Sequence, residues 1–211
     1  MKILMVSDIH SDYNAAISSY HSENSKDDPL DYVLDCGDHT DIKNLFEFVP
    51  HYYINGNHEP DEILVPEDQM PLPYRISPGQ TIVLPSKNHK VRVAGLDGNY
   101  TDPSKDYAVT NENIEKLERI EEGDLDILLT HESPVLARKN LQYKHMAEKV
   151  IRQIDRIKPK FVFSGHMNRF DDTLFTPGEI QNIVLEDMVK GYGVLRVGEE
   201  YRLERVRCRF G

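Results

Sequence analysis

The stretch Lys-Ile-Leu-Met-Val-Ser-Asp-Ile-His, residues 2–10, is a short apolar run that ends in a polar turn. Its length and composition are typical of a buried β-strand. The same arrangement recurs at four later places, where the apolar runs 32–34, 52–54, 127–129 and 161–163 lead into polar turns. Side chains at the carboxyl ends of strands in an α/β sheet gather in one crevice, so we expect the five turns to converge.

The segments between these runs predict helices at 13–25, at 110–121 and from Ser133 to about Ile157. Thr110 and the Ser133-Pro134 pair are suited to begin helices. Further strands are predicted at 81–84, 91–95, 183–185, 193–197 and 201–207, the last two joined as a hairpin. Strands that alternate with helices and are followed by a cluster of strands predict an α/β protein. One sheet would pack on another, with helices over the outer faces.

Composition and length favour one domain, spanning residues 1–211, because 211 residues with 39% hydrophobic content can bury one sizeable core. No apolar run is long enough to span a bilayer, and no cleavage site follows the first segment. The two cysteines, Cys36 and Cys208, lie far apart and favour a reducing, cytoplasmic setting. The net charge of -11 argues against broad binding to a nucleic-acid backbone, although bound cations can reverse the local charge.

The polar turns carry a mixed set of possible metal ligands. They read Asp8-Ile-His10, Gly37-Asp38-His39-Thr40-Asp41, Gly56-Asn57-His58-Glu59, Thr130-His131-Glu132 and Gly165-His166-Met167-Asn168. Imidazole, carboxylate and amide groups without a thiolate suit Mn, Fe, Zn or Ni rather than a structural zinc site. There are more ligands than one ion needs, so the sequence predicts two divalent ions with a bridging carboxylate. The predicted ligands are Asp8, His10, Asp38, Asn57, His131 and His166.

In this order, the motifs from Asp8 to Asn168 resemble those of the calcineurin-like metallophosphoesterase family. The resemblance implies a four-layer sandwich of two packed mixed β-sheets flanked by helices. It also implies hydrolysis of a phosphate ester, with two metal ions lowering the pKa of a water to roughly 7 so that hydroxide attacks phosphorus. Mn is the favoured metal. A long loop is predicted at 60–79, which contains five prolines and is a candidate for substrate recognition.

The resemblance also implies individual roles. Asp8 and His10 match ligands of the first metal, and Asp38 matches the carboxylate that bridges both ions. The match extends to three ligands of the second metal, Asn57, His131 and His166. His58 matches the residue that protonates the leaving oxygen or stabilises charge on the phosphate, and Glu59 is placed to orient it.

One position departs from the family pattern, whose last motif ends in a histidine that completes the first metal site. This chain has Asn168 there. An amide oxygen is a poorer ligand for these metals than imidazole, so the first site is expected to be weaker or more hydrated, and the enzyme to need added Mn. Asn168 is a predicted ligand of that site or binds nothing.

Substrate contacts are predicted for Asn57, His58 and His39, with a surface turn as the alternative for His39. Asp41 is expected to support its loop without a catalytic role. The stretch from Val91 to Asp106 loosely resembles the lariat-debranching branch of the family. That likeness makes Gly95, Gly98 and Tyr100 candidate site-wall residues, although a simple tight turn is the favoured interpretation of the two glycines. The remaining histidines, His21, His51, His89 and His145, are expected at the surface or in packing.

The predicted function is a phosphodiesterase acting on nucleotides or nucleic-acid ends. The alternatives are a phosphomonoesterase on another phosphorylated small molecule and a non-catalytic interaction module with the same fold. Retention of His58 favours catalysis.

Overall fold

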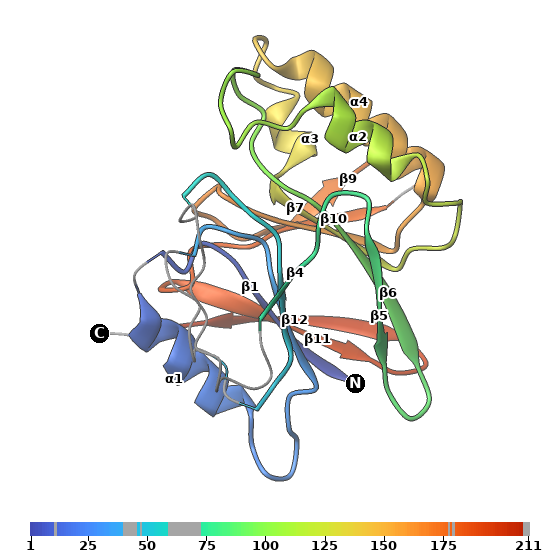
Figure 1. The fold of residues 1–211 in the computed structure, drawn as a ribbon. Coiled ribbons are helices and arrows are strands. Elements are labelled where there is room, and N and C mark those ends of the chain that lie inside the picture. Colours follow the sequence, from blue (N-terminus) through green and yellow to red (C-terminus); the bar gives the residue numbers. More distant parts are fainter. Residues whose placement is uncertain are drawn as a thin grey trace.

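The computed structural model describes residues 1–10, 12–39, 46, 48–58, 73–176, 178 and 180–208. Over these residues the strands form two six-stranded mixed sheets (Figure 1). In spatial order the first sheet contains β12 (Tyr201–Arg207), β11 (Gly191–Val197), β1 (Lys2–Val6), β2 (Tyr32–Asp35), β3 (His51–Tyr53) and β4 (Tyr74–Arg75). The second contains β5 (Thr81–Pro85), β6 (Lys90–Leu96), β7 (Ile127–Glu132), β8 (Phe161–Gly165), β10 (Gln181–Val184) and β9 (Asp171–Phe175).

The alternation of side chains along β1 shows how the layers pack. Ile3 and Met5 belong to the core between the two sheets, whereas Leu4 and Val6 belong to a second core under helix α1 (Tyr13–Glu23). Successive side chains of a strand point to opposite faces, so a strand covered on both sides is apolar throughout. The second sheet does the same, since Leu129 of β7 faces the first sheet and Leu128 packs with helix α4 (Lys144–Ile157).

The layers are therefore α1, the first sheet, the second sheet, and a group formed by α2 (Asn111–Leu117), α3 (Pro134–Ala137) and α4 (Figure 1). This confirms the predicted four-layer α/β architecture. No helix in the described part of the chain has the length and apolar character needed to cross a membrane.

The helix predicted from Ser133 to Ile157 is instead two helices, α3 and α4. After α3 the backbone tightens, because the Asn140 N–H donates to the Ala137 carbonyl, three residues back. The Asn140 side chain then accepts the Gln142 N–H at 3.1 Å. A side chain that bonds the backbone locally competes with the helix, which explains the break.

The other helices begin as predicted or one residue away. The Thr110 hydroxyl accepts the Asn113 N–H at 3.2 Å and caps α2, while Asp12 caps α1 by accepting the Ala15 N–H at 3.1 Å. The hairpin of β11 and β12 is confirmed. Strands β4 and β9 were not predicted. Strand β9 is an edge strand with two adjacent aspartates, and β4 follows the part of the predicted 60–79 loop that lies outside the described residues.

The directions of the strands place the predicted turns together. Strands β1, β2 and β3 are mutually parallel in the first sheet, as are β6, β7 and β8 in the second. Each of these strands except β6 leads into a predicted ligand turn, and β6 leads into the stretch Asp97–Tyr100. Parallel strands end at the same edge, so one end of the molecule collects the polar turns.

Candidate metal centre

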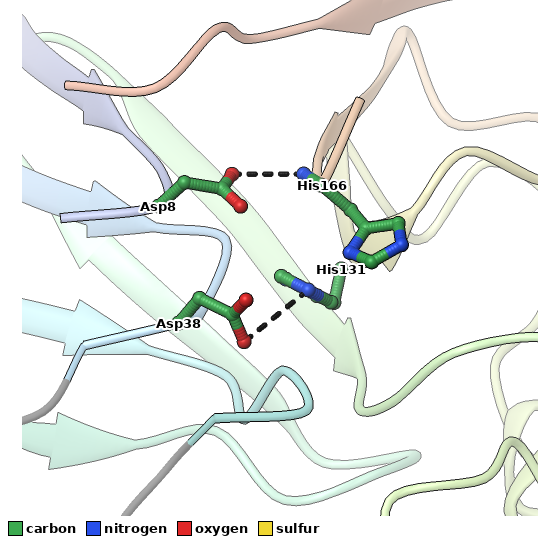
Figure 2. A group of neighbouring side chains, drawn as sticks. All are labelled: Asp8, Asp38, His131 and His166. Atoms are coloured by element: carbon green, nitrogen blue, oxygen red, sulfur yellow. Dashed lines mark hydrogen bonds and ion pairs between the residues drawn. The ribbon is translucent and has the colours of Figure 1, made fainter. Parts of the chain in front are cut away.

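Four predicted ligands from four strand ends meet at this edge. Figure 2 shows the Asp8 and Asp38 carboxylates facing the His131 and His166 imidazoles. One ligand atom from each residue lies within 4.8 Å of all the others. Asp8, Asp38 and His131 are buried, and His166 is half-buried. The two aspartates follow strands of the first sheet and the two histidines come from the second, so the centre joins the sheets.

The backbone at these turns adopts a conformation that is costly for most residues. Within the described residues, seven that are not glycine have positive φ. Five of them are predicted ligands: Asp8 (52°), His10 (49°), Asp38 (63°), His166 (65°) and Asn168 (51°). Left-handed backbone at non-glycine residues clusters at functional sites, where surrounding packing holds it in place. The turns are therefore held in one geometry at an energetic cost.

Asp38 presents its two carboxylate oxygens to different neighbours. Oδ1 accepts the N–H groups of Asn57 at 2.7 Å and His58 at 3.0 Å, and lies 3.4 Å from His131 Nε2. Oδ2 lies 4.0 Å from His10 Nε2. The carboxylate thus stands between His131 on one side and His10 on the other.

The tautomer of His131 follows from its contact with the backbone. Its Nδ1 lies 2.8 Å from the Cys36 carbonyl oxygen, which can only accept, so Nδ1 carries a hydrogen in the neutral ring. The lone pair is then on Nε2, which lies 3.1 Å from Asn57 Oδ1 and 3.4 Å from Asp38 Oδ1. Ligand atoms about 2.0–2.2 Å from one ion are separated by about 3–3.5 Å. The spacing around Nε2 therefore matches three ligands of a single cation.

The charges of the centre favour a cation. Burial opposes protonation of His131, but the hydrogen bond and charge of Asp38, together with the charge of Asp8, raise the pKa of this imidazole to about 9. Burial raises the pKa of Asp8, against the effects of His131 and of its hydrogen bonds. A cluster that stabilises positive charge on a buried imidazole also stabilises a divalent ion.

The absence of a side chain at two glycines makes space for the ligand side chains. A Cβ on Gly56 would overlap Asp38 Oδ1 and lie 2.6 Å from His131 Cε1. A Cβ on Gly165 would overlap Ser7 Oγ and Asp8 Oδ2. Glycine is thus required at both positions for close approach. The donor set and this glycine-lined space together fit a divalent metal ion.

Residues 1–184 match the calcineurin-like phosphoesterase superfamily domain. The chain belongs to the calcineurin-like phosphoesterase superfamily. A comparison with curated proteins gives no match.

Three solved structures share the fold of this chain. GAP50 of Plasmodium, an anchor in the inner membrane complex, is 11% identical over 100% of this chain and 85% of its own, with a TM-score of 0.65. TT1561 of Thermus thermophilus is 15% identical over 99% of each chain, with a TM-score of 0.60. The 5′-nucleotidase of Candida albicans is 14% identical over 98% of this chain and 51% of its own, with a TM-score of 0.56. At these identities the likeness shows the fold.

Three of the other predicted site residues lie at the exposed rim of the candidate metal centre. The His10 side chain is 49% exposed, and its ring lies edge-on to that of His58, which is also exposed, with 5.6 Å between the ring centroids. Asn168 is exposed, outside the group of four, and its amide nitrogen can face and donate to the Asp187 carboxylate. Asp187 in turn shares a hollow of about 450 Å³ with Asp8 and His10.

His39 does not fit its predicted contact with substrate. Its side chain is 0% exposed, with Nδ1 3.3 Å from Asp35 Oδ2 and the ring edge-on to Tyr53 at 4.7 Å between centroids. A side chain with no exposed surface cannot touch a substrate in solution, so His39 supports the turn from behind. Thr40, Asp41 and Glu59 lie outside the described residues.

Sequence reasoning missed Asn99, a buried residue after β6 that is 7% exposed. Its Nδ2 donates to Asn57 Oδ1 at 2.7 Å and lies 3.3 Å from His166 Nε2, so it holds two ligands of the centre. The signal was its position in a glycine-containing turn after a parallel strand, as for the predicted ligands. The three candidate site-wall residues, Gly95, Gly98 and Tyr100, are all buried. Gly98 also lines a hollow and has a φ of +89°.

Proposed function

We propose that this protein hydrolyses phosphate esters with two divalent cations, with Mn favoured over Fe, Zn or Ni. The observation that carries the proposal is the position of Asp38, whose Oδ1 faces His131 while Oδ2 faces His10. A carboxylate oriented in this way suits a bridge between two ions. Bound cations would offset the charge of the phosphate and lower the pKa of a water to roughly 7, which supplies the nucleophile.

The residues divide into two ligand sets that share Asp38. Asn57, His131 and His166 form one set, already oriented by Asn99 and the Cys36 carbonyl. Asp8 and His10 form the other, with Asn168 where the family has histidine. This set, which belongs to the first metal, is less complete because His10 is exposed and Asn168 faces Asp187. We expect one tight and one weak metal site; two tightly bound metals per chain after dialysis against a chelator would contradict this.

His58 is assigned to donate a proton to the leaving oxygen. Its backbone N–H is fixed by Asp38 Oδ1 at 3.0 Å, while its side chain is exposed beside His10. This arrangement ties the residue to the centre yet leaves the imidazole free to approach a substrate. We assign Asn57, in the same loop as His58, two roles: it binds metal and it contacts the phosphate.

We favour a phosphodiesterase acting on nucleotides or nucleic-acid ends, with a phosphomonoesterase as the alternative. The Candida albicans neighbour is a 5′-nucleotidase, which shows that the fold can serve nucleotide chemistry. The Plasmodium neighbour is an anchor, so the fold alone does not imply catalysis. Both cysteines are free, as expected in the reducing, cytoplasmic setting that we propose.

The test compares bis-p-nitrophenyl phosphate with p-nitrophenyl phosphate as substrates in the presence of Mn²⁺. Faster hydrolysis of the diester supports a phosphodiesterase, and faster hydrolysis of the monoester supports the alternative. Absence of both activities, together with retained Mn²⁺ binding, would favour a non-catalytic interaction module.

A further inference from the structure

A polar hollow of about 560 Å³ lies directly beside the metal centre. Gly56 and Asn57 form the wall shared with the centre, since Asn57 Oδ1 is only 3.1 Å from His131 Nε2. The other walls come from β4, from the turns after β4 and β6, from residues 106–108 and from α2. Its size is within the range of small-molecule sites. A phosphate ester bound at the centre would therefore direct one of its ester groups into this space.

Both cations of the hollow are paired with carboxylates. Arg75 forms an ion pair with the nearly buried Asp97, whose other oxygen accepts the Asn55 N–H at 2.8 Å. Lys116 lies 2.9 Å from Glu112. Asp106 adds a further carboxylate to the lining. Recognition of a second phosphate relies on cations that donate directly to it. The balanced charge of this hollow instead suits a neutral polar group.

The remaining lining residues include one aromatic and several polar side chains. Tyr107 is 39% exposed at the hollow. Asn55 also lines it, although its Oδ1 is itself buried. Asn113 and Ser77 add side chains that can donate or accept. An aromatic face combined with amide and hydroxyl groups is the combination that proteins use to bind an unstacked nucleobase.

We infer that this hollow binds the nucleoside part of a nucleotide ester whose phosphate lies at the metal centre, with the base stacked on Tyr107. The accessible side chains of Ser77 and Asn113 then hydrogen-bond the base or sugar. The inference rests on the proposed phosphoesterase function and adds the place where the nucleoside of such a substrate binds. It assigns Tyr107 as a specificity residue that takes no part in the chemistry.

The first experiment measures binding of thymidine, which has no phosphate, by equilibrium dialysis against the Mn²⁺-loaded full chain. Tyr107→Phe keeps an aromatic face and should retain binding, whereas Tyr107→Ala should weaken it roughly tenfold or more. Phe175→Ala is the matched control, because Phe175 is an exposed aromatic on β9 that does not line the hollow. Thermal unfolding of each variant shows that the fold is intact.

The second experiment compares two esters that release the same p-nitrophenol, thymidine 5′-(p-nitrophenyl phosphate) and methyl p-nitrophenyl phosphate. The wild-type kcat/KM should favour the thymidine ester by roughly tenfold or more, and Tyr107→Ala should reduce this ratio while Phe175→Ala preserves it. Hydrolysis of the methyl ester without thymidine binding, or thymidine binding unaffected by Tyr107→Ala, overturns the inference alone. Thymidine binding that depends on Tyr107, with neither ester hydrolysed, supports the nucleoside site and instead overturns the proposed hydrolysis.

Discussion

Replacing Gly56 by alanine tests whether the metal centre depends on close packing between its ligands. The added Cβ would lie 2.6 Å from His131 Cε1, whereas ordinary contact begins at 3.4 Å, so the imidazole or the loop must move by about 0.8 Å. The same carbon would overlap Asp38 Oδ1. A displacement of about 1 Å at reacting groups can reduce the rate roughly 100-fold. Overpacking of about 1–3 kcal/mol would lower Tm by roughly 2–12 °C in a chain of this size.

Isothermal titration with Mn²⁺, steady-state hydrolysis of bis-p-nitrophenyl phosphate and thermal unfolding would be measured on the same preparations. Gly198→Ala is the matched control, because the nearest atom to its added Cβ is 3.8 Å away and its φ is not positive. That variant should match the wild type in metal affinity and rate. If Gly56→Ala bound Mn²⁺ and turned over like Gly198→Ala, the view that glycine sets the spacing of Asp38 and His131 would be refuted.

Four further predictions concern the same machinery and its support. His58→Ala should lower kcat by roughly 100-fold or more while Mn²⁺ affinity, measured by titration, stays unchanged; an unchanged rate would remove its assigned role. Asn99→Ala should weaken Mn²⁺ binding by roughly 10- to 100-fold, while the exposed Asn88→Ala should not, as titration calorimetry would show. Removing metal with a chelator and restoring Mn²⁺ at about 100 times its Kd should raise the free energy of unfolding by about 2.7 kcal/mol, measured by denaturant titration. Burial lowers the pKa of His51, although the Asp35 carboxylate opposes this. The unfolded state therefore binds more protons than the folded state at low pH, and the free energy of unfolding should fall as the pH drops below about 6.5. Denaturant unfolding measured from about pH 7 to about pH 5 should show a smaller fall for His51→Gln than for the wild type.

The sequence predicted the parts of the fold that depend on local pattern. The five residues of β1 are all buried, and such a strand must be apolar on both faces. The group formed by Asp8, Asp38, His131 and His166 followed from a topological rule, since parallel strands deliver their carboxyl ends to one edge. Side chains far apart in the chain could therefore be assigned to one centre without coordinates.

Three features could not be predicted from the sequence, each for its own physical reason. The break between α3 and α4 depends on the Asn140 side chain accepting the Gln142 N–H in place of a helical hydrogen bond. These two hydrogen bonds compete, and the sequence alone does not indicate which of them forms. Asn99 had no motif to identify it, because its role consists of a contact with Asn57, 42 positions earlier. Polar edge strands such as β9 carry little alternation of hydrophobic and polar residues, so nothing in their composition separates them from loops.

His39 and His58 show why a motif gives the chemistry of a residue but not its direction. Each directly follows a predicted ligand, yet His39 is fully buried and His58 is exposed. After Asp38, with its φ of 63°, the chain forms an isolated parallel bridge between His10 and His39, and the His39 ring lies against Tyr53 and Asp35. After Asn57 the backbone N–H of His58 is held by Asp38, and its ring lies beside that of the exposed His10. The same residue type is therefore buried behind the turn in one case and lies at the exposed rim in the other, because the tertiary contacts of each turn set the direction of its side chain.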